Sequence, residues 1–185
     1  MLALEIKLRT YSISFSLAGY FSRNFYKKDW NQKMSADFQQ KLVNIATRSV
    51  AAASSCQNEE ATKMFLVLPF ISFLGYDHTN PSEVIPEHHA DFSEKYKNRV
   101  DFAVLRNNVP IIAIECKCQG APLKDQRGQL RSYFNAAKTV RVGILANGLQ
   151  WEFFSDSDEP NLMDEAPFLS IDLARKIHGG LADVA

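Results

Sequence analysis

Two apolar segments joined by a short turn constrain the fold of this chain more than any other feature. They cover residues 99–105 and 111–117, and both are rich in β-branched and apolar side chains. Arg106-Asn107-Asn108 between them is typical of a turn, since asparagine tolerates a positive φ angle. Pro110 opens the second segment. Runs that are apolar at nearly every residue are typical of strands buried on both faces. The sequence therefore predicts two neighbouring, central strands.

The remaining segments predict an α/β domain with a mixed sheet flanked by helices. Helices are expected over residues 35–53, 59–74 and 123–137, where apolar residues recur at helical spacing. The second helix should be kinked by Pro69 and end at Gly75. Further strands are expected at 84–87, 140–145, 149–154 and 168–173. Asn147-Gly148 is a hairpin turn, residues 88–98 a polar loop and residues 155–165 an acidic loop.

The length of 185 residues fits one domain with an appendage. We expect the domain to cover residues 34–178, followed by a frayed tail at 179–185. Residues 1–33 are either an upstream extension of the reading frame, with Met34 as the true start, or a loosely packed arm. No window is apolar for the ~20 residues that a membrane helix needs. We therefore expect a cytoplasmic protein that does not contact a membrane.

Charge is balanced overall but not along the chain. The 21 basic and 21 acidic residues exclude a globally basic nucleic-acid binder. Residues 117–141, however, hold six basic side chains against one acidic, and residues 152–165 hold six acidic side chains and no basic one. An anionic partner should therefore meet the middle segment. Its candidate phosphate contacts are Lys124, Arg127 and Arg131; the alternative is an ordinary solvated helix face.

The cysteines and histidines carry no metal motif. Cys56, Cys116 and Cys118 lack the paired spacing of a zinc site, and we expect free thiols in a reducing cytosol. His88, His89 and His178 are expected to be surface residues.

Three charges interrupt the apolar hairpin: Asp101, Glu115 and Lys117. Burying a lone charge is expensive, so their presence in central strands needs a reason. Glu115 and Lys117 are two residues apart and share a face, and Asp101 lies on the neighbouring strand. The two carboxylates, with the backbone carbonyl of Cys116, suit Mg²⁺, for which Mn²⁺ should substitute. Lys117 would orient a water molecule or offset charge on a phosphorane-like transition state, as in metal-assisted phosphodiester hydrolysis. The alternative is a buried ion pair or solvated strand ends.

Taken together and in order, several stretches resemble a known family. They are EEATKMFLVLPFISFLGYD, VIPE, RVDFAVL, IIAIECK, QLRSYF, VGILANG, and FFSD followed by PFLSIDL. This pattern resembles the PD-(D/E)XK nuclease superfamily, which has the restriction-endonuclease-like fold. It is more similar still to the N-terminal nuclease domain of type I restriction enzyme R subunits, in a small stand-alone form.

The resemblance implies a catalytic set and a fold. Asp101, Glu115 and Lys117 match the acids and the lysine of the two core strands. Gln129 and Tyr133, at i and i+4 of the following helix, match a glutamine and a tyrosine that would contact the DNA backbone or orient Lys117.

The resemblance also implies an acid on the helix before the sheet, for which Glu59 and Glu60 are the candidates as a further metal ligand. Val100 stands where the superfamily has proline. The carboxylate of Asp101 is the half of that motif that would bind metal, so the missing proline does not argue against activity.

The expected function is a Mg²⁺-dependent DNA endonuclease. The sequence contains no GxxxxGK[ST] loop, so we expect no ATP site, and any translocation must come from another polypeptide. Expected partners are DNA and a translocase, methyltransferase or specificity subunit; a homodimer would supply two active sites for two cuts. The alternatives are a non-catalytic DNA- or partner-binding module that keeps the fold, and a plain α/β interaction domain.

Overall fold

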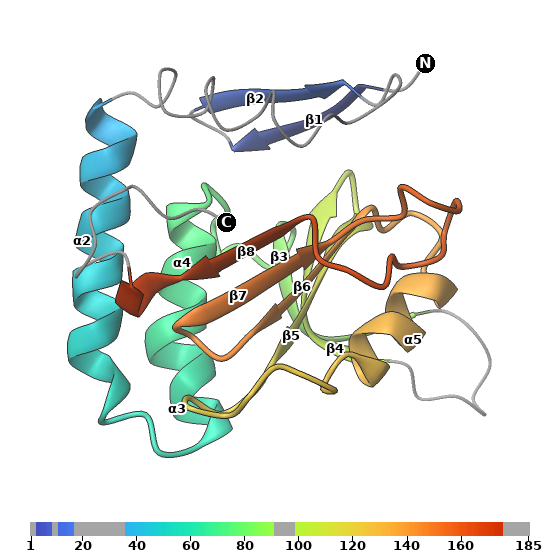
Figure 1. The fold of residues 1–185 in the computed structure, drawn as a ribbon. Helices are drawn as coiled ribbons and strands as arrows, with labels where there is room; N and C mark the ends of the chain where they lie inside the picture. Colours follow the sequence, from blue (N-terminus) through green and yellow to red (C-terminus); the bar gives the residue numbers. More distant parts are fainter. Residues whose placement is uncertain (1–2, 9–10, 17–35, 91–98, 176–185) are drawn as a thin grey trace.

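The computed structural model describes residues 3–8, 11–16, 36–90 and 99–175, with side chains from residue 38 onward (Figure 1). The first helices are α2 (Ala36–Ala53), α3 (Glu59–Thr62), the π-helical turn η1 (Lys63–Val67) and α4 (Leu68–Phe73). They are followed by β3 (Val84–His89), β4 (Arg99–Arg106), β5 (Val109–Cys116), α5 (Gly128–Ala136), β6 (Val142–Ala146), β7 (Gln150–Phe154) and β8 (Leu169–Asp172). This order of elements is the one that the sequence predicted.

The six strands from β3 to β8 form one sheet in sequence order. β5 and β6 are parallel, and α5 makes the crossover between them; all other neighbours are antiparallel. In Figure 1, α2 and α4 lie on one face of the sheet and α5 on the other. The predicted α/β class, with a mixed sheet flanked by helices, is confirmed.

A second, two-stranded sheet lies within residues 1–33. It pairs β1 (Ala3–Leu8) with β2 (Tyr11–Ser16) in antiparallel register. No strand was expected there from the sequence. The proposed start at Met34 and the tail at 179–185 lie outside the described residues.

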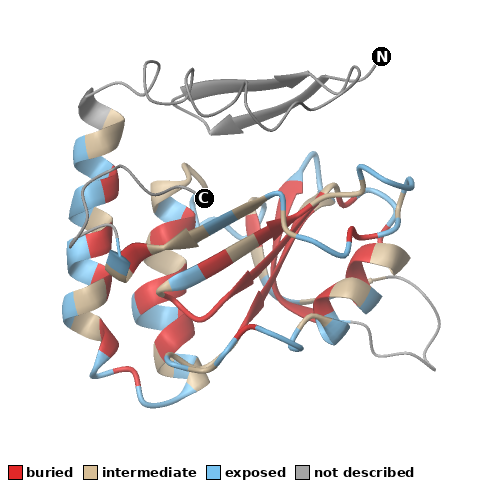
Figure 2. Cartoon of the chain, in the orientation of Figure 1, coloured by how far each residue is buried: buried red, intermediate tan, exposed pale blue. Residues whose placement is uncertain are grey.

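Both faces of the central strands are buried, as their apolar runs predicted (Figure 2). Along β4, Phe102 and Val104 join the core cluster beneath α2 and α4. Ala103 and Leu105 join the cluster beneath α5. The period of two thus divides one continuous apolar strand between two cores. The joining turn has Asn107 at φ 53° and Asn108 at φ 61°, the left-handed pair that a two-residue type I′ hairpin requires.

Pro69 produces a π-helical turn rather than a simple kink. A proline inside an α-helix lacks an N–H donor, and its ring clashes with the carbonyl four residues earlier. Here the wide turn η1 ends two residues before it, and the Leu68 N–H donates to the Lys63 carbonyl, five residues back. The segment 59–73 is therefore three joined pieces, and Gly75, at φ 94°, follows its end as expected.

Several predicted boundaries were wrong. β3 continues through His89, so the loop expected at 88–98 does not begin at His88; residues 91–98 lie outside the described part. α5 begins at Gly128 rather than 123, because Asp125 adopts a φ of 66° that no right-handed helix contains. β6 begins at Val142 rather than 140.

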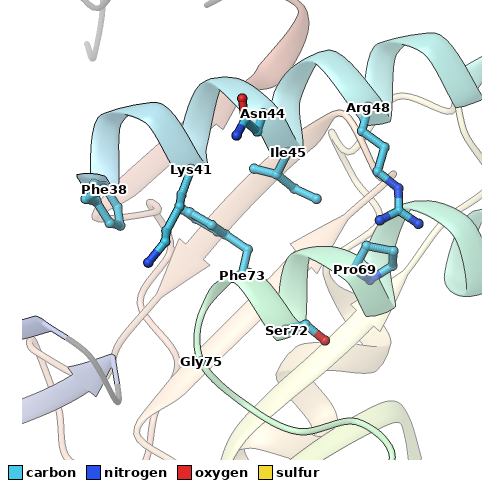
Figure 3. Close-up of a pocket in the computed structure, with 9 residues that line it drawn as sticks. All are labelled: Phe38, Lys41, Asn44, Ile45, Arg48, Pro69, Ser72, Phe73 and Gly75. Carbon is cyan, nitrogen blue, oxygen red and sulfur yellow. The ribbon is translucent and has the colours of Figure 1, made fainter. Parts of the chain in front are cut away.

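No helix among the described residues is long and apolar enough to span a lipid bilayer. A shallow hollow of about 440 Å³ opens between α2 and α4 (Figure 3). Its lining combines aromatic, aliphatic and basic side chains: Phe38, Lys41, Asn44, Ile45, Arg48, Pro69, Ser72, Phe73 and Gly75. None of the site residues expected from the sequence lines it.

We expect Gly148→Ala to destabilise the domain more than Gly120→Ala, as measured by chemical denaturation. Both glycines have a positive φ, so each alanine costs ~1–2 kcal/mol of backbone strain. A Cβ on Gly148 would also lie 2.5 Å from Leu66 Cδ1, which adds ~1–3 kcal/mol of overpacking, whereas a Cβ on Gly120 meets nothing within 4 Å. Equal losses would show that the β6–β7 turn does not press against η1.

Candidate functional site

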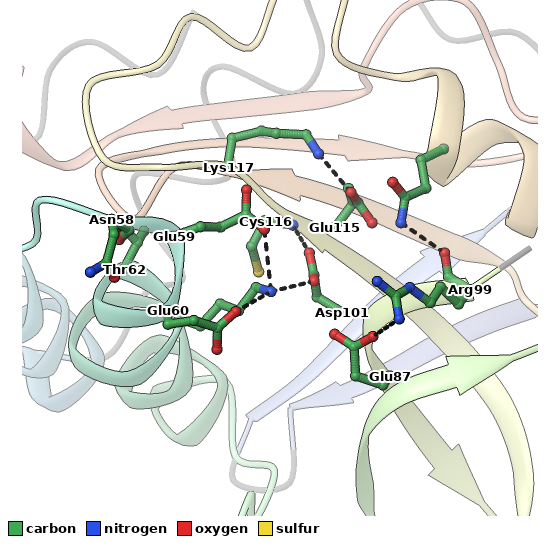
Figure 4. A network of polar contacts seen from close by, with 12 residues as sticks. Asn58, Glu59, Glu60, Thr62, Glu87, Arg99, Asp101, Glu115, Cys116 and Lys117 are labelled. Atoms are coloured by element: carbon green, nitrogen blue, oxygen red, sulfur yellow. Dashed lines mark hydrogen bonds and ion pairs between the residues drawn. The ribbon is translucent and has the colours of Figure 1, made fainter.

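Asp101 and Glu115 meet where β4 and β5 separate (Figure 4). The paired register of these strands ends at Phe102 and Ile114. One residue further, Asp101 Oδ2 accepts the Cys116 N–H at 2.6 Å, so a side chain takes over from the backbone ladder. Both carboxylates are nearly buried, with Asp101 at 7% exposure and Glu115 at 2%. The structure therefore brings together the two acids that the sequence singled out.

Glu115 and Lys117 form a close ion pair at this end of the sheet. Lys117 Nζ donates to Glu115 Oε1 at 2.6 Å, while Glu115 Oε2 is buried and accepts no hydrogen bond. Burial and the neighbouring charge of Asp101 raise the pKa of Glu115 to about 7, although Lys117 opposes the shift. Burial lowers the pKa of Lys117, but the hydrogen bond to Glu115 and the negative charges of Glu115, Glu59 and Asp101 together raise the net pKa.

A second lysine, Lys63, contacts Asp101 from the helical side. Its Nζ lies 2.7 Å from Asp101 Oδ1, 2.9 Å from Glu60 Oε1 and 3.2 Å from Glu59 Oε1. Burial alone would lower the pKa of Lys63, but hydrogen bonds to Asp101 and Glu60 raise it overall. Sequence reasoning missed this residue. Its signal was a lysine three and four residues after two acids, at the start of an otherwise apolar run.

The site offers oxygen donors of the kind that a hard divalent cation takes. The buried Oε2 of Glu115 has no partner, and a buried carboxylate oxygen without one is costly unless a cation or water satisfies it. The Cys116 N–H faces Asp101, and in an extended strand the carbonyl of the same residue points the same way. No group of three acidic, histidine or cysteine side chains suited to a metal occurs among the described residues. Mg²⁺ can be held by one or two carboxylates and several waters, so magnesium binding by Asp101 and Glu115 stays a prediction.

Glu59 and Glu60 are both held by Lys63 rather than aimed at Glu115. The side chain of Glu59 is 42% exposed and that of Glu60 is 83% exposed. The charge of Glu59 also contributes to the raised pKa of Glu115. Of the two expected candidates, Glu59 is therefore the one that acts electrostatically on the site, although its role as a ligand stays a prediction.

Gln129 and Tyr133 do not share an exposed face. Gln129 is exposed at the start of α5, where its Nε2 donates to the Arg99 carbonyl at 3.2 Å, two residues before Asp101. Tyr133 is fully buried, and its hydroxyl lies 2.7 Å from His88 Nδ1. His88 was expected at the surface and is instead half-buried in β3. His89 is exposed, and His178 lies outside the described residues.

An ion pair stands beside the site on β3 and β4. Arg99 binds Glu87 at 2.7 Å, and both side chains are about half exposed. Glu87 has a φ of 51°, which strains a residue other than glycine. The register places Glu87 between the paired Pro86 and His88, and hence across from Asp101. No sequence signal distinguished this pair from ordinary surface charges.

The basic residues after β5 do not form a basic helix face. Arg131 lies within α5, Arg127 is its N-cap, and Lys124 precedes it as an exposed residue. Arg127 binds Glu152 at 3.0 Å and stacks over the Phe154 ring at 4.9 Å. Arg131 likewise binds Glu165. The basic segment and the acidic loop therefore neutralise each other in part, and the expected DNA contacts, Tyr133 included, stay predictions.

The comparison with protein families matches the part of the chain that holds the paired acids. Residues 87–162 match the family described as type I restriction enzyme R protein N terminus. This range covers β4, β5 and α5, and with them Asp101, Glu115, Lys117 and Gln129. A search of curated proteins found no match. The resemblance to this family that the sequence motifs indicated is confirmed over residues 87–162, whereas membership of the PD-(D/E)XK superfamily stays a prediction.

The raised pKa of Glu115 predicts a pH effect on stability. The folded protein keeps this proton up to about pH 7, while the unfolded chain releases it near 4.5. The stabilisation by the neutral carboxyl is therefore complete below pH 4.5 and lost as the pH rises to about 7. Glu115→Gln, which cannot ionise, should gain up to about 3 kcal/mol relative to wild type between these pH values, since one pKa unit is worth about 1.4 kcal/mol. Denaturation curves at several pH values measure this, and a constant difference would contradict it.

Proposed function

Because residues 87–162 match the N-terminal domain of type I restriction enzyme R proteins, we propose that this chain is a Mg²⁺-dependent DNA endonuclease. The observation that carries the proposal is the junction of β4 and β5, where Asp101 and the Glu115–Lys117 pair meet beside a buried carboxylate oxygen without a partner. An apolar sheet has no structural need for such an oxygen. A hydrolase that works on a phosphodiester does need carboxylates and a lysine arranged together.

Each residue has a defined part in this proposal. Asp101, Glu115 and the Cys116 carbonyl would hold the ion, which supplies positive charge to a phosphate oxygen when bound. Lys117, fixed by Glu115 at 2.6 Å, would orient the attacking water or offset charge on the transition state. Gln129 would position the start of β4 through its bond to the Arg99 carbonyl. Mn²⁺ should replace Mg²⁺.

The proposed partners follow from the same family. DNA would be the substrate, and a translocase, methyltransferase or specificity subunit would be a partner; these 185 residues themselves contain no GxxxxGK[ST] loop for ATP. Two chains acting as a homodimer would cut both strands. The cytoplasm is the proposed location, since DNA and such subunits are found there.

One observation favours the second candidate function, a non-catalytic module that binds DNA or a partner protein. Asp101 is already satisfied by the Lys63 ammonium and the Cys116 N–H, as in a purely structural ion pair. The unpaired oxygen of Glu115 and the separate Lys117 favour the nuclease, because a structural ion pair requires neither.

Calorimetric titration of Mg²⁺ and Mn²⁺ into the purified protein, with plasmid nicking measured in parallel, tests the nuclease. We expect Glu115→Ala to abolish both metal binding and nicking. Lys117→Ala and Asp101→Asn should lower nicking at least ~100-fold, the usual effect of removing one charge-stabilising or proton-transferring group. Asparagine keeps an acceptor for the Cys116 N–H, so this variant should stay folded.

Arg106→Ala is the matched control, because it removes a charge at the other end of β4 and should nick as wild type does. Metal binding without nicking would indicate a missing partner subunit. Neither binding nor nicking would favour the non-catalytic module.

Lys124→Ala tests the DNA contact of the basic segment. Lys124 is exposed, whereas Arg127 is held by Glu152 and the Glu165 carbonyl. Removing one phosphate contact should weaken DNA binding uniformly across sequences and reduce the salt slope by about 1. Arg127→Ala should chiefly lower stability. Fluorescence anisotropy at several salt concentrations measures the slope, and an unchanged slope for Lys124→Ala would remove this residue from the interface.

A further inference from the structure

The proposed metal site contains more negative charge than one divalent metal ion would balance by itself. Four carboxylates, those of Asp101, Glu115, Glu59 and Glu60, surround the ammonium groups of Lys63 and Lys117. When all six groups are ionised, two negative charges remain, and one divalent cation would balance them. Within the described part of the chain, Lys117 forms its ion pair with Glu115, and Lys63 forms ion pairs with the other three carboxylates.

The backbone and the surrounding side chains hold Lys63 in a fixed, nearly buried position. Its side chain is only 10% exposed, and it is the first residue of the π-helical turn before Pro69. An ammonium is a compact point charge, and an uncompensated one in this environment is costly. Its shortest contact, 2.7 Å, is with Oδ1 of Asp101. That carboxylate is one of the two proposed metal ligands.

We propose that Lys63 is the internal counter-ion of the metal site, which holds Asp101 in the metal-free protein and competes with Mg²⁺ for its carboxylate. This inference rests on the proposed nuclease function. The Lys63 ammonium neutralises and orients Asp101, and it thereby sets how tightly the site binds a cation. Lys63 is a positioning residue, because it acts on a metal ligand rather than on the substrate.

Glu59 and Glu60 make the competition feasible. Both lie on the same helical face as Lys63, one turn earlier, at 3.2 and 2.9 Å from its ammonium. When a cation takes over Asp101, these two carboxylates keep the ammonium paired, so no buried charge is left alone. The acid that the resemblance placed on this helix thus acts through Lys63.

Lys63→Met tests the proposal by metal binding and stability, apart from activity. Methionine keeps the length and the apolar stem of lysine but removes its charge. In calorimetric titration of the full chain, Mg²⁺ should bind at least about tenfold more tightly, because a positive charge in contact with a ligand has been removed. The metal-free variant should melt at a lower temperature than wild type, and saturating Mg²⁺ should raise its melting temperature more than that of wild type.

Arg106→Met is the charge-matched control. It removes one positive charge five residues along β4 from Asp101, about 17 Å at ~3.4 Å per residue. This distance exceeds the Debye length of about 8 Å at physiological salt, so the affinity for Mg²⁺ should stay at the wild-type value. An equal gain in both variants would mean that net charge alone controls affinity, and it would overturn the role of Lys63.

An unchanged Mg²⁺ affinity in Lys63→Met would mean that Lys63 only forms a structural ion pair. A weaker affinity would mean that Lys63 organises the ligands, and either result would overturn the proposed competition.

Glu60→Gln is a second test should Lys63→Met fail to fold, because Glu60 is 83% exposed. Loss of this anchor commits Lys63 more strongly to Asp101, so Mg²⁺ should bind several-fold more weakly, and an unchanged affinity contradicts the proposal. Wild-type protein that binds no Mg²⁺ would instead refute the nuclease function itself.

Discussion

The hydrogen bond from the Cys116 amide to Asp101 is the contact on which the arrangement of the site depends. At this point β4 and β5 stop pairing by backbone, and a carboxylate takes the place of a carbonyl acceptor. The strands can therefore part without leaving a buried amide unsatisfied. Their separation gives Glu115 room to lie beside Asp101, and it opens the end of the sheet to the helix that carries Lys63. The separation of β4 and β5 at this hydrogen bond therefore determines both the end of the strand pairing and the position of the charged side chains.

The strands and the acid pair could be predicted from the sequence because local patterns determine them. An apolar run on both sides of an Asn-Asn turn permits little besides a central hairpin. Charges inside such a run are unusual, so Asp101, Glu115 and Lys117 could be singled out from the sequence alone. The order of helices and strands was predicted on the same grounds.

The remainder depended on tertiary contacts that no short window contains. Lys63 is four residues from Glu59 in sequence but acts across 38 residues on Asp101. From the sequence, the basic segment was expected to be an open phosphate-binding face. The ion pairs that partly neutralise it, such as Arg127–Glu152, join segments far apart in the sequence, so no short window reveals them. Tyr133 has a helical position that fits either an exposed or a buried face, and only packing against the sheet decides between them.

Because of the π-helical turn, this segment should tolerate substitutions better than insertions or deletions. Each residue added to or removed from a helix rotates everything beyond it by about 100°. The wide turn at Lys63–Val67 absorbs such a rotation, so that the residues before it face the charge cluster while those after it face the apolar core. Variation across homologues should therefore substitute residues here freely at exposed positions such as Met64, yet rarely insert or delete one. Alignment gaps would be expected in the loops on either side of this helix instead.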